Sequence, residues 1–229
     1  MVIEEEHHSQ NRERELRIYD ATRDLLLHYG YDKTTVSDIA NKAGISKGAI
    51  YLHFSSKDEL VSALLKHEIS AYTDEVLTVL EQDEDNLTFV NLYQKTLVLL
   101  PNYPLVQAII RGDSRVFGAY LSRSSQEFIE IKRTQRFPLL KMMQDVGALR
   151  ADVNMRVVAF ILDCLGYGLL HASEFVEEDQ IPEITAISSE MGMMLERYLM
   201  PDDGGNLNAA RDILLNMIRS YRTQLFDEK

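Results

Sequence analysis

The stretch TTVSDIANKAGISKGAIYLHFSSKDEL, residues 34–60, decides the fold of the segment that holds it. Thr35, followed by Asp38 three residues later, predicts an N-cap and a capping box at the start of a short helix. Gly44 permits a tight left-handed turn, and Ser46 predicts the cap of a second short helix. Two short helices around such a turn indicate a helix-turn-helix, whose second helix can place its first residues in a major groove of DNA.

The two short helices need a small apolar core of their own. Apolar residues recur at helical spacing in both, and the core is expected to hold Val36, Ile39, Ile45 and Ile50. Ala40 must be small because the second helix crosses it closely. These residues favour two packed helices over two independent ones.

The rest of the chain shows helical periodicity almost throughout and no strand signal, so we expect an all-α protein. The motif S-x-x-E at 56–59 predicts a second capping box, which opens a long helix. The acidic stretch EQDEDN at 81–86 is interpreted as a loop or a seam between domains. Ten helices are expected, the two short ones and others at about 12–28, 56–80, 87–100, 104–121, 124–146, 154–177, 183–199 and 206–226.

Composition and charge indicate an ordinary globular chain. Of its 229 residues 45% are hydrophobic and 26% are charged. The net charge of −12 is unevenly spread, with +1 over residues 10–66 and −10 over residues 67–229. Acid therefore gathers outside the helix-turn-helix, but a segment at +1 is no basic patch, and charge alone does not establish DNA binding.

Cysteine content and hydropathy bear on the compartment. The single cysteine, Cys164, excludes an internal disulfide framework, suits a reducing cytosol and is expected to be an inert core thiol. The opening MVIEEEHHSQ is acidic and has no apolar stretch, so no signal peptide is expected. The most apolar run, VVAFILDCLGYGLL, is shorter than the roughly 20 residues that a bilayer demands and contains Asp163. We therefore expect a soluble cytoplasmic protein.

Residues 12–66 resemble the signature of the tetracycline-repressor (TetR) family in order and spacing. A long first helix ends in YGYDKTTVSDIA, the turn reads KAGISKGAIYLHF, and SSKDEL starts the fourth helix. The resemblance implies a helix-turn-helix domain at 1–55, with an N-terminal arm, that binds operator DNA. It also implies that 56–229 form a helical domain that dimerises and binds a small ligand, and that the protein is no enzyme.

The resemblance assigns DNA contacts residue by residue. Thr35 matches a residue whose hydroxyl or backbone N–H meets a phosphate, and Tyr51 and His53 match positions that hold phosphates. Lys47 is the only long donor at the start of the recognition helix, so we expect it at a base edge or a phosphate. Lys57 matches a residue that grips the backbone from a helix N-terminus. The predicted DNA-binding set is Thr35, Ser46, Lys47, Gly48, Ala49, Tyr51, His53 and Lys57.

Several details of this interface stay open. Small Gly48 and Ala49 let the recognition helix sit deep, and Ala49 is placed to meet a thymine methyl. Tyr51 can serve through its ring in the core rather than through its hydroxyl. Arg12 and Arg14 alternate with acidic residues and form either an arm toward the adjacent groove or a solvated helix start. With one charged residue on the recognition helix, indirect readout and backbone contacts gain weight.

Aromatic residues and methionines are frequent in the middle helices. A filled core explains any single one of them, but together they allow an apolar cavity with a few polar tips, which suits a neutral or weakly charged organic effector. No cofactor is expected. The predicted ligand-binding set is Tyr72, Phe89, Tyr93, Phe117, Tyr120, Phe128, Phe160, Tyr167 and His171.

Two further patterns bear on assembly and chemistry. Small residues at 166, 168 and 172, with the apolar face of 183–199, predict a four-helix interface in a homodimer, as a two-fold symmetric operator requires. His171 and Glu174 lie at i, i+3, but no third ligand is visible, so no metal site is expected.

The sequence therefore predicts a repressor that a small molecule releases from a palindromic operator. Because no catalytic motif is present, an enzyme with an appended helix-turn-helix and a reaction centre near His171 is the weaker alternative. An activator, or a regulator that needs no ligand, stays open.

Overall fold

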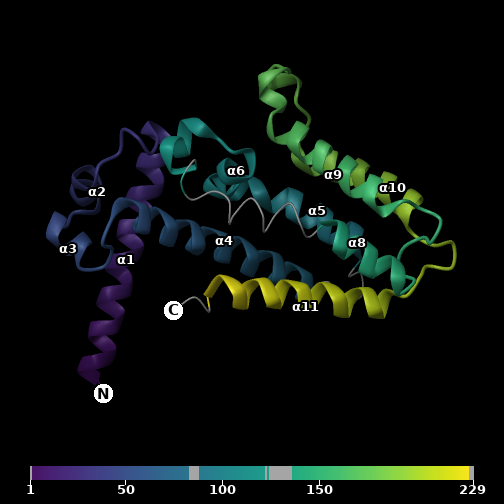
Figure 1. Ribbon diagram of the computed structural model, residues 1–229, viewed down its shortest axis with the longest axis horizontal. Helices are drawn as coiled ribbons and strands as arrows, with labels where there is room; N and C mark the ends of the chain where they lie inside the picture. Colours follow the sequence, from purple (N-terminus) through teal and green to yellow (C-terminus); the bar gives the residue numbers. More distant parts are fainter. Residues whose placement is uncertain (1, 83–87, 122, 124–135, 227–229) are drawn as a thin grey trace. The chain divides into compact units, whose positions relative to one another are not determined.

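The computed structural model describes residues 2–82, 88–121, 123 and 136–226, and every regular element among them is a helix (Figure 1). The predicted all-α fold class is therefore confirmed. The α-helices are α1 (Val2–Tyr29), α2 (Val36–Ala43), α3 (Lys47–Tyr51), α4 (Lys57–Gln82), α5 (Phe89–Leu99), α6 (Pro104–Arg111), α8 (Arg136–Asp145), α9 (Met155–Leu170), α10 (Ile184–Leu199) and α11 (Leu207–Phe226). Short 3-10 turns lie at η2 (Leu100–Asn102), η3 (Ala172–Glu174) and η4 (Glu178–Gln180).

Three predicted helices differ from the observed ones. The first begins at Val2, so Arg12 and Arg14 lie inside α1 and not in a pre-helical arm; no glycine or proline precedes Arg12 to stop the helix. The helix expected over 104–121 breaks at Gly112, which has φ +66°, and resumes at 114–121. The helix expected to 177 ends at Leu170 and continues as 3-10 turns. Most of the helix expected over 124–146 lies outside the described residues, apart from α8.

The chain divides into two compact units. The first holds Met1–Ile69 with Pro104–Gln126, and the second holds Ser70–Tyr103 with Glu127–Lys229. Helix α4 begins in the first unit and ends in the second. The predicted boundary after residue 55 divides the chain by function, and it stays a prediction.

The first unit is built around buried side chains of α1, which packs on α2 and α6, and whose Tyr19 ring stacks on that of His67 in α4. Ile18 and Leu26 of α1, Ile39 of α2, and Leu60 and Leu64 of α4 are all fully buried. Ile18 and Leu26 lie eight residues apart, and Leu60 and Leu64 lie four apart, which is the spacing of one helical face. The unit thus has a core of its own.

The second unit has a separate core. In it α5 packs on α10, and α8 packs on both α9 and α11. The core is closed by Leu139, Leu140 and Met143 of α8 with Val158 and Leu162 of α9. Helix α11 therefore packs on the body of its own unit, through Ala210 and Leu214.

Candidate nucleic-acid interface

Local capping sets the helix-turn-helix. The Thr35 hydroxyl accepts a hydrogen bond from the Asp38 N–H at 3.2 Å, and the Asp38 carboxylate accepts one from the Thr35 N–H at 2.9 Å. This capping box confirms the one predicted from sequence. Hydrogen bonds that the Asp38 carboxylate accepts from the Thr35 hydroxyl, at 2.6 Å, and from the Thr35 N–H hold the pKa of Asp38 below its usual value. Gly44 ends α2 in the left-handed conformation, with φ 67° and ψ 35°.

The next two helices are also capped by serines. The Ser46 hydroxyl accepts from the Ala49 N–H at 3.1 Å and starts α3. The Ser56 hydroxyl accepts from the Glu59 N–H at 3.0 Å and starts α4. The predicted reciprocal bond is wrong in one detail, because the Glu59 carboxylate accepts from the Ser55 N–H, at 2.7 Å, and not from the Ser56 N–H.

One buried side chain of α3 anchors this helix in the helix-turn-helix. Ile50 is 1% exposed, and Phe54, which follows the helix, is 6% exposed. Ile45, which was predicted to share this core, is only half-buried. Burying Ile50 turns the opposite side of the helix outward, which is the side that a major groove would receive.

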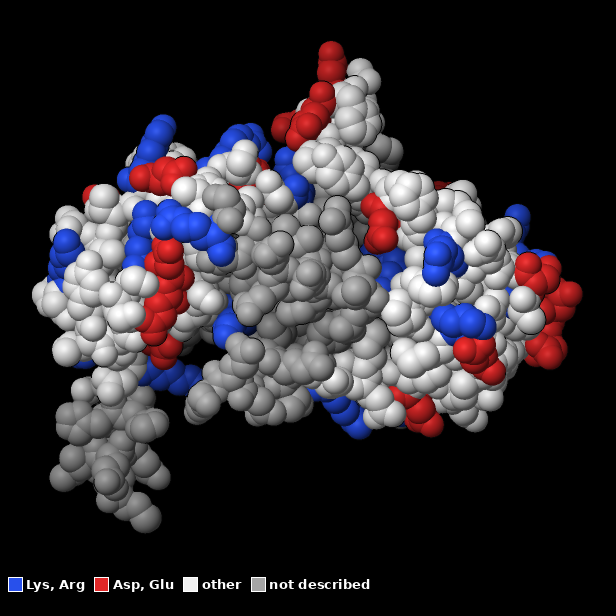
Figure 2. Space-filling view, in the orientation of Figure 1, with Lys and Arg blue, Asp and Glu red and all other residues white. Residues whose placement is uncertain are grey.

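The predicted DNA-binding residues are mostly exposed. Thr35, Ser46, Lys47 and Gly48 are exposed, and Tyr51 keeps 48% of its surface in contact with solvent. The Lys47 ammonium lies 5.8 Å from the centroid of the Tyr51 ring, so the two side chains lie on one flank of α3. Half-buried Ala49 and His53 complete the set on this helix and just after it. Basic and acidic side chains both reach the surface around α2 and α3 (Figure 2).

Lys57 has a different environment. Its ammonium donates to the carbonyl oxygens of Tyr31 and Thr34 at 2.8 and 2.9 Å, and it lies 3.7 Å from the centroid of the Tyr31 ring. Burial lowers the pKa of this group. The ammonium thus ties the first turn of α4 to the loop between α1 and α2. Its contact with a DNA phosphate stays a prediction.

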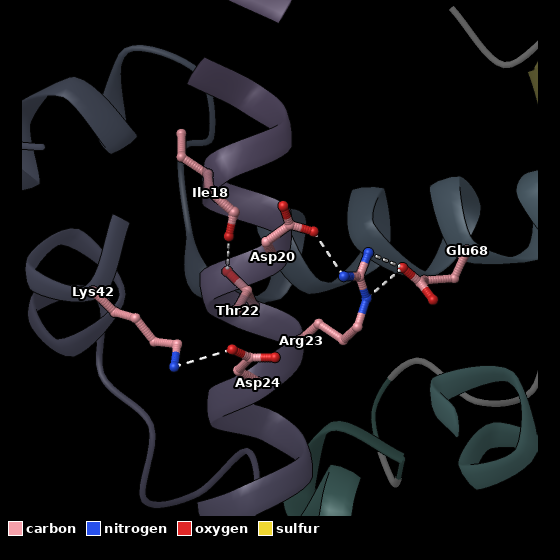
Figure 3. Close-up of polar contacts among 7 residues, drawn as sticks. All are labelled: Ile18, Asp20, Thr22, Arg23, Asp24, Lys42 and Glu68. Atoms are coloured by element: carbon pink, nitrogen blue, oxygen red, sulfur yellow. Dashed lines mark hydrogen bonds and ion pairs between the residues drawn. The ribbon is translucent and has the colours of Figure 1, made fainter. Parts of the chain in front are cut away.

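Two ion pairs hold α1 to its neighbours (Figure 3). Two guanidinium nitrogens of Arg23 donate to one carboxylate oxygen of Glu68 in α4, at 2.6 and 2.8 Å, and Glu68 is a buried residue. Lys42 of α2 pairs with Asp24 of α1 at 3.0 Å, near the surface. Sequence reasoning missed the Arg23–Glu68 pair, because partners that lie 45 positions apart leave no local signal.

A brace from the segment 113–123 holds the loop after α1. The Tyr31 N–H donates to the Val116 carbonyl at 2.7 Å, and the Tyr31 ring lies 5.6 Å from that of Tyr120. Gly30 has φ +80°, and a Cβ atom there would lie 2.3 Å from the Arg115 carbonyl oxygen. Gly30, which directly follows the last residue of α1, thus permits this close approach.

The predicted ligand-binding residues fall into three groups. Phe117 and Tyr120 are buried in the first unit, where Tyr120 takes part in the brace. Tyr72, Phe89 and Tyr93 belong to the core of the second unit or pack against it. The others are Phe160 and Tyr167, which are 68% and 60% exposed, half-buried His171, and Phe128, which lies outside the described residues.

One core residue of this set carries an unused polar group. Among the described residues, no hydrogen-bond partner exists for the Tyr93 hydroxyl, although Tyr93 is only 6% exposed. The Arg136 guanidinium lies 5.8 Å from the centroid of the Tyr93 ring. Burial raises the pKa of Tyr93, so its hydroxyl keeps its proton and can donate.

Other candidate chemistries find little support in the described part of the chain. His171 Nδ1 lies 2.8 Å from the Glu174 carboxylate, but no group of three residues able to hold a metal occurs among the described residues. Cys164 is exposed on α9, so its prediction as a core thiol is wrong. No helix in the described residues has the length and apolar character needed to cross a membrane.

The chain belongs to the TetR family of bacterial regulatory proteins. The family model for these proteins matches residues 18–64, which contain the helix-turn-helix. The HTH-type transcriptional regulator TtgR of Pseudomonas putida is 34% identical over 147 residues, which cover 63% of this chain and 68% of that protein. The uncharacterized HTH-type transcriptional regulator YvdT of Bacillus subtilis is 34% identical over 76 residues, which cover 39% of that protein.

The fold agrees with this membership. The crystal structure of FadR from Bacillus subtilis in complex with stearoyl-CoA matches with a TM-score of 0.58 and 20% identity, over 79% of this chain and 96% of that one. The chain is thus a TetR-family transcriptional regulator with a DNA-binding helix-turn-helix.

Proposed function

We propose that this regulator represses transcription as a homodimer on a two-fold symmetric operator, and that a small organic effector releases it. The observation that carries the DNA-binding half is the geometry of α3. Ile50 anchors the helix in the module, while Lys47 and Gly48 stay exposed at its N-terminal end. The N-terminal residues of a recognition helix are those that meet base edges.

The homodimer is supported by exposed apolar side chains on α9 and α10. Val157, Ile161 and Gly168 share one stripe of α9, and Met194 and Tyr198 share one of α10. Val157 and Ile161 are 50% and 48% exposed, and Met194 and Tyr198 are 68% and 56% exposed. Contiguous exposed apolar surface on a soluble chain favours an interface. Two copies would align two recognition helices with successive major grooves, as a symmetric operator requires.

The effector half of the proposal is supported by Tyr93. A buried hydroxyl without a partner is costly, and a ligand with a hydrogen-bond acceptor would satisfy it. The Tyr93 ring lies 6.2 Å from that of Phe89 in an apolar core, and the Arg136 guanidinium lies 5.8 Å from its centroid. The apolar part of these surroundings favours a neutral or weakly charged organic molecule with an acceptor. FadR of Bacillus subtilis, whose fold is similar, has been crystallised with stearoyl-CoA, which supports an organic effector in this fold but says nothing of its charge.

Coupling from effector to DNA would use the connections between the two units. Helix α4 runs from residue 57 in the first unit to residue 82 in the second. The segment 104–121 belongs to the first unit and carries the brace on Tyr31. A ligand that shifts either connection would alter the helix-turn-helix orientation and its fit to the operator.

The test has a DNA arm and an effector arm. DNA from upstream of the chain's own gene is used in gel shifts, with wild type and Lys47→Ala, and transcription is measured with and without the protein. Specific binding that Lys47→Ala weakens, together with lower transcription, supports the proposal. Mass spectrometry of natively purified protein then seeks a bound molecule, which is added back to test release.

The same experiment separates the alternatives. An activator raises transcription, and a regulator without a ligand binds DNA but shows no release by any purified molecule. An enzyme near His171 would convert the bound molecule. Absence of specific DNA binding would overturn the proposal as a whole.

A further inference from the structure

The recognition helix carries a large apolar side chain that nothing in the structure covers. Leu52 is 85% exposed, more than Tyr51 beside it and far more than Ile50 at 1%. Its backbone is helical, with φ −73° and ψ −24°, and its N–H donates to the Gly48 carbonyl at 3.2 Å. Leu52 therefore continues the surface of α3.

Its direction follows from helix geometry. At about 100° per residue, Leu52 lies some 160° from Ile50, the residue that anchors the helix. Gly48, four residues earlier, falls on the same outermost line. Leu52 thus stands on the side of α3 that faces away from the core.

Gly48 makes this position more open still. A helical side chain leans over the preceding turn, toward residue i−4. Here that residue is a glycine, and a Cβ atom built on it would meet only the Ser46 hydroxyl oxygen, at 3.8 Å. Leu52 consequently leans over bare backbone, and its surface stays free for a partner outside the chain.

We propose that Leu52 reads a thymine methyl group in the major groove and so sets part of the operator's sequence preference. This rests on the proposed operator binding. The surface shares one line of α3 with exposed Gly48 and lies on the side of the recognition helix that faces away from the core, so its occupant is DNA. Leucine cannot hydrogen-bond a phosphate, and the 5-methyl of thymine is the apolar group that base pairs present in the major groove.

The experiment begins by selecting an operator from random duplexes with the wild-type chain. Affinities are then measured for the selected duplex, for an unrelated duplex, and for versions in which single thymines are replaced by uracil, which lacks the methyl. Wild type is compared with Leu52→Ala, and Leu207→Ala is the matched control, because Leu207 is a 41% exposed leucine in α11.

Leu52→Ala is expected to weaken operator binding about fivefold, because it removes the carbon atoms that contact the thymine methyl group. Wild type should lose a similar factor at one symmetric pair of uracil positions, and Leu52→Ala should be insensitive there. Melting temperature should not change, because Leu52 makes no buried contact.

The inference would be overturned by unchanged operator affinity in Leu52→Ala, or by equal uracil sensitivity of the two proteins at every thymine. It would also be overturned if Leu52→Ala lost the same affinity for the operator and for the unrelated duplex, because Leu52 would then contact the sugar–phosphate backbone. If selection enriches no sequence, the proposed operator binding itself fails.

Discussion

At the scale of single residues, the hydrogen-bond partners of two tyrosine hydroxyls and one lysine ammonium indicate whether each group serves the fold or a ligand. The Tyr72 hydroxyl donates to the Thr96 carbonyl at 3.0 Å, whereas that of Tyr93 has no partner among the described residues. Both rings pack in the same unit. If the Tyr72 hydroxyl stabilises the fold and the Tyr93 hydroxyl serves the proposed ligand, removing each hydroxyl in turn should have different effects.

We expect Tyr93→Phe to leave the free energy of unfolding unchanged or to raise it by about 1 kcal/mol, because it removes an unsatisfied buried group. Tyr72→Phe, the matched control, should lower it by about 1 kcal/mol. Chemical denaturation measures both, and release from DNA by the co-purified effector should be weakened in Tyr93→Phe. A clear loss of stability in Tyr93→Phe would mean that the hydroxyl serves the fold.

Lys57→Ala is expected to lower the free energy of unfolding by about 1–2 kcal/mol, because two hydrogen bonds from a charged donor are lost. The dependence of operator binding on salt should keep its slope, since the ammonium is used inside the protein. Denaturation and binding at several salt concentrations check both. A slope smaller by about one unit would show instead that Lys57 leaves its carbonyls for a phosphate, as the family resemblance implies.

At the scale of helices, the first unit depends on a long-range ion pair. Glu68 of α4 has 7% of its side chain exposed and receives two hydrogen bonds from Arg23 of α1. Removing only the arginine would leave a buried carboxylate without its cation. Loss of one partner of a buried ion pair lowers the free energy of unfolding more than replacement of both partners by apolar residues. The pair therefore holds α4, at Glu68, against α1.

Arg23→Met should lower the free energy of unfolding by about 2–3 kcal/mol, somewhat less than for a fully buried pair because Arg23 is 27% exposed. The double variant Arg23→Met with Glu68→Met should recover most of this loss. Asp20→Ala removes the exposed partner of the same arginine and should cost under about 0.5 kcal/mol. Equal stability of Arg23→Met and wild type would refute the role given to the pair.

Local signals predicted the helix ends well, and long-range contacts escaped them. Thr35, Gly44 and Ser46 act on backbone groups within a few residues, so their roles could be read from the sequence. Gly112 was overlooked, although a glycine followed by an aspartate is an ordinary break signal. The brace on Tyr31 depends on where the segment 113–123 packs, and no local pattern reveals that.

The candidate site shows the same division. Exposure of Gly48 followed from periodicity, because it lies on the side of α3 opposite buried Ile50. Lys47 lies only three residues from Ile50, and its exposure is that expected of a long charged side chain. The side chains of Phe160 and Tyr167 are apolar enough for a core, and only the packing of α9 shows that they are exposed. Their exposure favours a contact between chains over a cavity wall. Composition alone cannot distinguish a core from an interface.

At the scale of the whole molecule, the proposed homodimer would cover the outer faces of α9 and α10. Gly168 lies on the α9 stripe with Val157 and Ile161, and a Cβ atom built on it meets nothing within 4 Å. Met194 is 68% exposed on α10. Substitutions at these two positions should therefore act on assembly and leave the fold of one chain intact.

Wild type should sediment as a dimer at micromolar concentration, and Gly168→Glu or Met194→Lys should shift it toward monomer, because a charge in an apolar interface loses its hydration. Thr185→Lys is the control, since Thr185 is exposed on α10 about half a turn from Met194. Circular dichroism should show unchanged helicity in all three variants.

Operator binding should weaken when the dimer is lost, because a monomer offers one recognition helix to one half-site. A wild-type monomer would contradict the dimer itself, and intact dimers in both variants would move the interface away from α9 and α10.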